Sequence, residues 1–481
     1  MKKGISVLLA ALLMVMWLTA CGSSGGSGNV EESAAGSAES AQAAEDSDVP
    51  ENSPPGEPPS GGFPGGNPPD GVPGGQPGSS TDITYTAAVE ILSADTQDEQ
   101  TYASSAADQS ALLISTPEEV SISNPTVTKS GDSNGGDNCN FYGLNAAVLV
   151  KDGTATTISG GSVVSDASGA NGVFCYGGNG GQNGASGDGT TLTIRDTAIT
   201  TTGDGSGGIM TTGGGVTSAQ NLTITTSGQS SAPIRTDRGG GTVTVDGGSY
   251  TSNGLGSPSV YSTADITIFN AALTSNLSEG VCIEGKNSIT LRECYLTANN
   301  TRCNGNATFL DTIMIYQSMS GDADSGTSVF TMTGGTLTSK SGHIFHVTNT
   351  NAVIALEDVT VVNEDEDDVL LSVCSDGWSG ADNIATLNAS AQTLHGAVLV
   401  GDDSTLTLNL SDESDFTGYI DGNITNASGA TVSTEVGTVS VTLDNSSTWT
   451  LTADSYITEF HGDTANVISN GYTLYVGGIA L

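Results

Sequence analysis

Asp265-Ile-Thr-Ile268 and Ser288-Ile-Thr-Leu291 are two copies of a short sequence pattern that recurs along the chain with varying residues. Each copy alternates apolar and polar residues, is rich in Val, Ile and Thr, and is bounded by Gly, Asn or Asp, as strands and turns are. One apolar residue from each of four copies recurs at intervals of 21, 23 and 23 residues: Ile224, Val245, Ile268 and Leu291. A repeat this short must stack on its neighbours to bury its apolar side. The sequence therefore predicts an all-β fold, a β-solenoid.

One coil of this solenoid is longer than the others. The next apolar positions, Met332 and Leu356, follow after 41 and 24 residues. We therefore expect an insertion in the coil between Leu291 and Met332, with the regular repeat continuing on both sides of it.

The composition agrees with stacked coils. The chain has 481 residues, of which 36% are hydrophobic and 5% aromatic, and it contains 66 Gly. A single globular core of this size would be short of bulky side chains. A solenoid core is a thin column of small residues, and Gly, Asn and Asp serve its turns.

The charge excludes one class of partner. With 11 basic and 53 acidic residues, the formal net charge is −42. Such a surface repels phosphate backbones, so we expect no nucleic-acid binding. Solubility and resistance to edge-on association explain this charge, and the alternative is a specific attraction for cations.

The N-terminus predicts export and an anchor. Met1-Lys-Lys-Gly4 is a short positive start, Ile5 to Leu18 is an apolar run, and Leu18-Thr-Ala-Cys21 ends it. This order is typical of a secretory signal, and its end is similar to a bacterial lipobox. We expect residues 1–20 to be a lipoprotein signal peptide and Cys21 to carry the lipid, which would hold the chain at the extracellular face of the cell membrane. The alternative is an ordinary signal peptide.

The remaining chain divides by composition. Residues 21–82 are rich in Ser, Gly and Pro, too polar to fold, and predict a disordered stalk. Residues 83–141 have atypical turns and predict N-terminal capping coils that shield the open strand edge. Residues 142–438 predict the regular parallel β-helix, and residues 439–481, which change register, predict C-terminal coils and a cap.

The lipobox, the Gly/Pro stalk and the Thr/Gly-rich coils together resemble bacterial adhesin-like surface lipoproteins with a pectate-lyase-like right-handed parallel β-helix. Ser447-Thr-Trp-Thr-Leu-Thr452 is similar to the last coils of many secreted β-helix proteins. The resemblance covers residues 83–481 as architecture. It implies right-handed winding and a cell-surface location, but no ligand.

Few basic residues are present, so those that could form a site stand out. Aligning Ile234, Val260 and Ile283 as inward residues predicts that the residue after each points outward on consecutive coils. The same alignment places Asp237 and Lys286 at equivalent positions. The candidate ligand face comprises Arg235, Asp237, Arg238, Tyr261, Glu284, Lys286 and Tyr316. Aromatic rings beside charged groups suit sugars, and the alternative is a set of cross-coil salt bridges on a solvated face.

The neighbourhood of the candidate ligand face contains no known catalytic signature. The neighbourhood lacks Asn-Thr-Asp, Gly-His-Gly and Arg-Ile-Lys, the signatures that the resemblance to pectate lyases and polygalacturonases would imply. We therefore name no catalytic residue. If the protein is an enzyme, Asp237 is the candidate, although no second carboxylate can be paired with it from the sequence.

Two further features concern metals and thiols. Asp322-Ala-Asp324-Ser-Gly326 matches the first half of a calcium loop, but Thr333 stands where the loop needs Glu. Ca²⁺ at Asp322 and Asp324 is therefore a partial match, and no other cofactor is expected.

Six cysteines follow Cys21. Their spacing leaves disulfides open, and Cys175 and Cys282 suit small apolar positions in the core.

Three functions remain open at this point. The first is a lipid-anchored, adhesin-like surface protein with a non-catalytic binding face, whose partners are glycans or cell-wall polysaccharide. The second is a polysaccharide lyase or glycoside hydrolase on the same coils. The third is a purely structural envelope protein.

Overall fold

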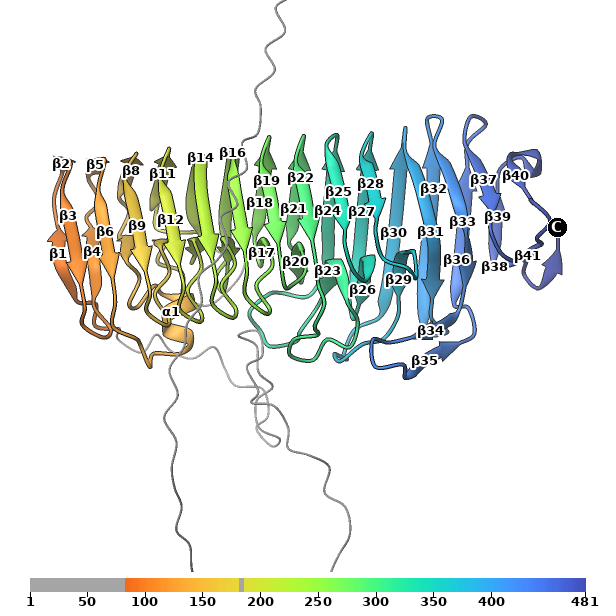
Figure 1. Ribbon diagram of the computed structural model, residues 1–481, viewed down its shortest axis with the longest axis horizontal. Helices are drawn as coiled ribbons and strands as arrows, with labels where there is room; N and C mark the ends of the chain where they lie inside the picture. Colours follow the sequence, from red (N-terminus) through yellow and green to blue (C-terminus); the bar gives the residue numbers. More distant parts are fainter. Residues whose placement is uncertain (1–82, 181–185) are drawn as a thin grey trace, which may run out of the picture. The chain divides into compact units, whose positions relative to one another are not determined.

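The computed structural model describes residues 83–180 and 186–481, and they form a parallel β-helix. Three strands and three turns make each regular coil, and each strand pairs in parallel with its counterpart on the next coil (Figure 1). Parallel strands joined by such connections wind right-handed in nearly all proteins. The expected fold class is confirmed. The expected signal peptide, Cys21 and stalk lie outside the described residues.

One strand of each coil belongs to a fifteen-stranded sheet, here called sheet A. Its strands, in spatial order, are β1 (Ala87–Ile91), β4 (Ser110–Ser115), β7 (Val148–Lys151), β10 (Val173–Tyr176), β13 (Ile209–Thr212), β15 (Ile234–Thr236), β17 (Val260–Ser262), β20 (Val281–Glu284), β23 (Asp311–Tyr316), β26 (His343–Thr348), β29 (Val369–Val373), β31 (Thr393–Val400), β33 (Asp415–Asp421), β37 (Thr448–Leu451) and β40 (Val467–Ile468).

The other two strands of each regular coil belong to sheet B, which has two columns. The first column contains β2 (Asp95–Asp98), β5 (Glu119–Ser123), β8 (Ala155–Ser159), β11 (Thr191–Arg195), β14 (Gly215–Thr226), β16 (Gly241–Ser252), β18 (Asp265–Phe269), β21 (Ser288–Arg292), β24 (Thr327–Thr333), β27 (Asn351–Glu357), β30 (Asn383–Ser390), β32 (Ser404–Ser411), β36 (Thr438–Leu443) and β39 (Glu459–His461). The second contains β3 (Thr101–Ser104), β6 (Thr126–Lys129), β9 (Ser162–Ser165), β12 (Ala198–Thr201), β19 (Ala272–Ser275), β22 (Tyr295–Ala298), β25 (Thr336–Ser339) and β28 (Thr360–Asn363). The long strands β14 and β16 run through both columns.

The register confirms most of the repeat and corrects one copy. Val245, Ile268, Leu291 and Met332 are successive partners, so the 41-residue interval is one enlarged coil as expected. Ile224, however, pairs with Tyr250 in the second column, and Ala219 is the partner of Val245. The prediction was wrong there because β14 continues for 12 residues and its second half carries a phrase of the same pattern.

A single apolar spine fills the coils. Alternate residues of each strand point inward, and their Val, Ile and Leu side chains join one buried cluster that extends from Ile91 to Leu474. Residues 87–129 already contribute two three-strand coils to it, in register with those that follow. At the other end, β38 (Ser455–Ile457), β41 (Leu474–Val476) and β42 (Ile479–Ala480) form a separate small sheet with an antiparallel pair.

The outer faces of the two sheets differ. Sheet B is exposed or half-exposed at alternate residues, as in β18. Sheet A is buried on both faces over most of its length, as in β23 and β29. Its cover comes from α1 (Asp137–Phe141), from long loops, and from the hairpin of β34 (Asn423–Thr425) and β35 (Thr431–Thr434), which project from one edge of the coils (Figure 1).

Candidate functional site

The residues of the candidate ligand face point away from the spine of sheet A, as expected, but most of them are buried. Arg235 is 3% exposed, Asp237 1%, Glu284 1% and Tyr316 1%. Tyr261 lies among them, packed in a cluster outside the spine. The expectation of a row open to solvent is therefore wrong, because loops and α1 cover it.

The strand register of the candidate ligand face also differs from the one predicted by aligning Ile234, Val260 and Ile283. Tyr261 pairs with Arg235 on one side, as expected, but with Cys282 on the other, not with Glu284. Glu284 pairs with Tyr316. Arg235, Tyr261 and Cys282 are aligned on successive coils. Two residues after them, Asp237 is therefore level with Glu284 and not with Lys286. The strands here contain only three or four residues, which is too short a pattern to fix the register from sequence.

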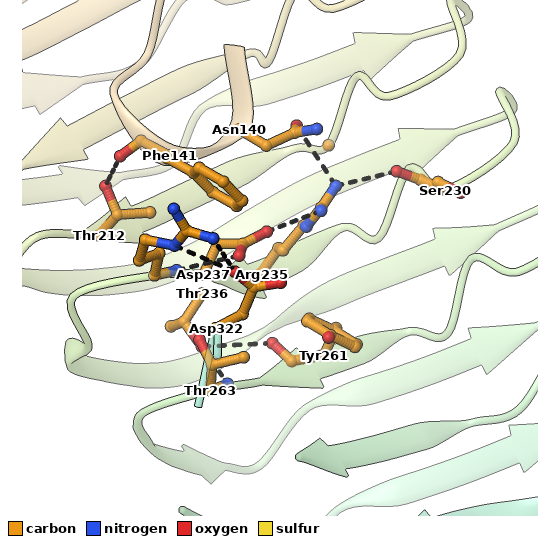
Figure 2. Close-up of polar contacts among 12 residues, drawn as sticks. Asn140, Phe141, Thr212, Ser230, Arg235, Thr236, Asp237, Tyr261, Thr263 and Asp322 are labelled. Atoms are coloured by element: carbon orange, nitrogen blue, oxygen red, sulfur yellow. Dashed lines mark hydrogen bonds and ion pairs between the residues drawn. The ribbon is translucent and has the colours of Figure 1, made fainter. Parts of the chain in front are cut away.

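An ion pair between Arg235 and Asp237 lies at the centre of the covered face (Figure 2). An Nη atom of Arg235 lies 2.8 Å from Asp237 Oδ2, and the other donates to the carbonyl oxygen of Ser230 at 3.0 Å and to Asn140 Oδ1 at 3.4 Å. The guanidinium carbon lies 5.7 Å from the centre of the Tyr261 ring. Asn140 belongs to α1, so this arginine ties the helix to the sheet.

Arg238 connects sheet A to the inserted segment of the enlarged coil. Its Nε donates to Asp322 Oδ1 at 3.0 Å, and its guanidinium carbon lies 4.1 Å from the centre of the Phe141 ring of α1. Asp322 lies in the segment 317–326 of the enlarged coil. The carboxylate that the partial calcium match singled out therefore has a guanidinium partner. Asp324, the second one, pairs with Lys286 at 2.8 Å in an exposed contact.

Glu284, in β20, joins the same network two coils away from Arg235. Its Oε2 accepts from the hydroxyl of Tyr261 at 2.6 Å and from that of Tyr316 at 3.3 Å, and its Oε1 accepts from Ser318. Ser320 links this group to Asp322 Oδ2 at 2.9 Å. One polar network, from Arg235 to Tyr316, thus joins four coils to the loop that covers them.

Burial raises the pKa of two carboxyl groups in this network. It raises the pKa of Asp237 to about 7, with Asp322 adding to the rise and Arg235 opposing it. Burial also raises the pKa of Glu284, against hydrogen bonds from Ser318 and Tyr261. The network contains three carboxyl groups and two guanidinium groups. One bound proton on a carboxyl group would therefore make its net charge zero.

Raising the pH from about 5 to about 8 should lower the thermal midpoint of the wild type more than that of an Asp237→Asn variant. The folded-state pKa of Asp237, about 7, lies above its usual 3.8, so the folded chain holds a proton that the unfolded chain has lost. The stability contributed is complete below the unfolded pKa and is lost as the pH rises through the folded one. Equal pH slopes in melting curves of the two proteins would contradict this assignment.

Several members of the network could not be expected from the sequence. Asn140 and Phe141 lie about a hundred residues before the arginines that they contact, and Ser318 and Ser320 lie in the insertion. Trp378 packs on Tyr316, with ring centres 4.9 Å apart. No spacing or motif links these residues, and only the stacking of coils and loops brings them together.

The open face of sheet B carries a second arrangement, here called the threonine ladder. Six threonines are successive partners on six coils: Thr200, Thr225, Thr251, Thr274, Thr297 and Thr338. Neighbouring strands are about 4.8 Å apart, so their hydroxyls form a regular row. Within the described residues these six hydroxyls make no hydrogen bond, and all six residues are exposed or half-exposed.

Tyr295 stands beside this ladder. It belongs to the strand of Thr297, two residues before it, and is 64% exposed. Arg292, which is also exposed, ends the preceding strand of the same coil next to Phe269 of the coil before. An aromatic ring beside unpaired hydroxyls can contact both the apolar and the polar side of a ligand.

No protein family, curated protein or solved structure matches this chain in the comparisons. Among the residues that the structure describes, no helix is long and apolar enough to cross a membrane. The same part of the chain contains no group of three or more His, Cys, Asp or Glu residues arranged for a metal ion. Its six cysteines are all free: Cys175 packs in the spine, and Cys282 packs in the cluster outside it.

Proposed function

We propose that this protein is a non-catalytic, carbohydrate-binding β-helix that a lipid on Cys21 anchors at the cell surface, as adhesin-like proteins are. The observation that carries the proposal is that Tyr295, beside the threonine ladder, is 64% exposed. The proposed ligand surface is therefore the open face of sheet B. The covered Arg235 network has the role of fastening loops and α1 to sheet A.

The chemistry of this face suits a sugar chain. A pyranose ring has an apolar side that stacks on an aromatic ring and a rim of hydroxyl groups that exchange hydrogen bonds with threonines. The rise of about 4.8 Å between coils repeats the same hydroxyl along the axis, so a linear glycan can meet equivalent partners on successive coils. The net charge of −42 favours neutral glycans over polyanionic ones.

Replacing Tyr295 by Ala should weaken glycan binding about tenfold or more, because a stacked aromatic anchor commonly contributes over 1 kcal/mol. The measurement is a glycan array followed by titration calorimetry with the glycans that bind. Tyr456→Ala is the matched control, since that tyrosine is also partly exposed but lies in the C-terminal sheet. Stability should change little in either variant. A full-length protein that binds no glycan at all would refute the proposed function.

One observation favours a second candidate, an enzyme that cleaves polysaccharides. Asp237, with its pKa near 7, shares a network with the carboxyl groups of Asp322 and Glu284, and a carboxyl group with such a pKa can act as a general acid. The cover over Arg235 and Asp237 argues against substrate access. Release of reducing or unsaturated sugars by the purified protein, abolished in Asp237→Ala, would favour this candidate over binding alone.

A further inference from the structure

Two acidic side chains outside the Arg235 network are stacked at the corner that leads into sheet A. Glu279 is 2% exposed and Asp311 1%. Val281 pairs with Ile313, and Gly280 N donates to the carbonyl oxygen of Thr312 at 2.8 Å. Glu279 is therefore level with Asp311 on the next coil, with their backbones about 4.8 Å apart.

A single amide joins the two acids. Asn300 Nδ2 donates to the main-chain oxygen of Asp311 at 3.2 Å, and the Asn300 side chain also hydrogen-bonds to Glu279. Asn300 is 1% exposed. Its Oδ1 and Asp311 Oδ1 are both buried and have no hydrogen-bond partner within the described structure. Two acceptor oxygens at this buried corner, one of the amide and one of the Asp311 carboxyl group, thus have no donor within the described structure.

Within the described residues no basic side chain balances this charge, and Glu279 Oε2 accepts a hydrogen bond from the hydroxyl of Ser278. None of the ion pairs formed by described residues includes Glu279 or Asp311. Burial, and after it the charge of Glu279, raises the pKa of Asp311 well above its usual range. A shared proton would supply one donor and remove one charge. A divalent cation would neutralise both carboxylates and take their oxygens, including the unpaired Oδ1 of Asp311, as ligands, and oxygen is the ligand that Ca²⁺ prefers. A turn of the Asn300 amide about its last side-chain bond would present its unpaired oxygen to the same cation.

We propose that Glu279, Asp311 and Asn300 form a buried binding site for a divalent cation of the Ca²⁺ class. The site lies within the coils and away from the open face of sheet B, so it serves the stability of the β-helix. Because it is sealed, the cation enters as the coils fold, and its binding free energy adds to folding. This site is distinct from the partial calcium match at Asp322 and Asp324, whose carboxylates pair with Arg238 and Lys286.

The test begins with the metal content of the full-length protein after refolding in CaCl₂ and exhaustive dialysis. We expect about one Ca²⁺ per chain by elemental mass spectrometry. Refolding in EDTA should lower the thermal midpoint by about 3 °C or more, and refolding in CaCl₂ should restore it. The Glu279→Gln/Asp311→Asn variant should retain no Ca²⁺ and should melt at the same temperature with Ca²⁺ and with EDTA.

The matched control is Glu364→Gln/Glu366→Gln, which removes the same two charges from an exposed turn. It should bind and respond to Ca²⁺ as the wild type does. If the double variant at the corner does not fold, Asp311→Asn alone and the metal content of the wild type still decide the matter. A wild-type protein that refolds equally well in EDTA and carries no cation would overturn the proposal and would leave a shared proton as the occupant.

Discussion

Replacing Arg235 by Ala should lower the free energy of unfolding by about 3–5 kcal/mol, because it leaves the buried carboxyl group of Asp237 without its partner. The contacts to Asn140 and Ser230 are lost in the same step, so α1 should also loosen from the sheet. The loss should be larger at about pH 8 than at about pH 5, since a protonated Asp237 tolerates burial better. Equilibrium unfolding in guanidinium chloride measures the effect.

Two further variants make this prediction specific. Arg195→Ala removes an exposed arginine of β11 and should change stability by no more than about 0.5 kcal/mol. Arg235→Met/Asp237→Leu removes both charges and should recover much of the loss, because the buried carboxyl group that Arg235→Ala leaves without its partner is gone as well. If Arg235→Ala were as harmless as Arg195→Ala, the ion pair would not be buried in the native protein.

Replacing Phe330 by Ala should cost about 3–5 kcal/mol, as deletion of a fully buried aromatic side chain usually does. Phe330 is 0% exposed, pairs with Ile289 and Ile354 in the spine, and has its ring centre 5.8 Å from that of Phe345. The loss is large because the coils on both sides hold the strand in place and cannot collapse into the space.

The neighbouring residue provides the control. Thr331 follows Phe330 in β24 and points outward, half-exposed. Thr331→Ala should change the free energy of unfolding by no more than about 0.5 kcal/mol. Similar losses for Phe330→Ala and Thr331→Ala in denaturant unfolding would mean that the alternation of inward and outward residues is wrong at this coil.

Much of the fold could be predicted because every coil must stack on the next one. This requirement gives each coil the same alternating strand pattern, which is visible in the sequence. The partners Ile268, Leu291 and Met332 follow from matching one strand phrase to the next, even across the insertion. Ile224 was misplaced because both columns of sheet B use the same alternation, and periodicity alone cannot tell one column from the other.

The site was predictable only in part. The outward orientation of Arg235 and Tyr261 followed from the alternation of residues in a strand, and their pairing is confirmed. Their burial could not be predicted, since it depends on α1 and on loops, whose contacts join residues as far apart in the sequence as Asn140 and Arg235 or Phe141 and Arg238. Tyr295 was not singled out, because an exposed tyrosine in a strand has no sequence signal that separates it from a buried one such as Tyr250.

The most direct test of the account is hydroxyl-radical footprinting of the native protein, with tyrosine oxidation read by mass spectrometry. Tyr295 should be oxidised rapidly, and Tyr250, Tyr261 and Tyr316 should be protected until the protein is unfolded. This result would place the open surface on sheet B and the polar network beneath the loops of sheet A. Oxidation of Tyr261 and Tyr316 as fast as that of Tyr295 would contradict the account.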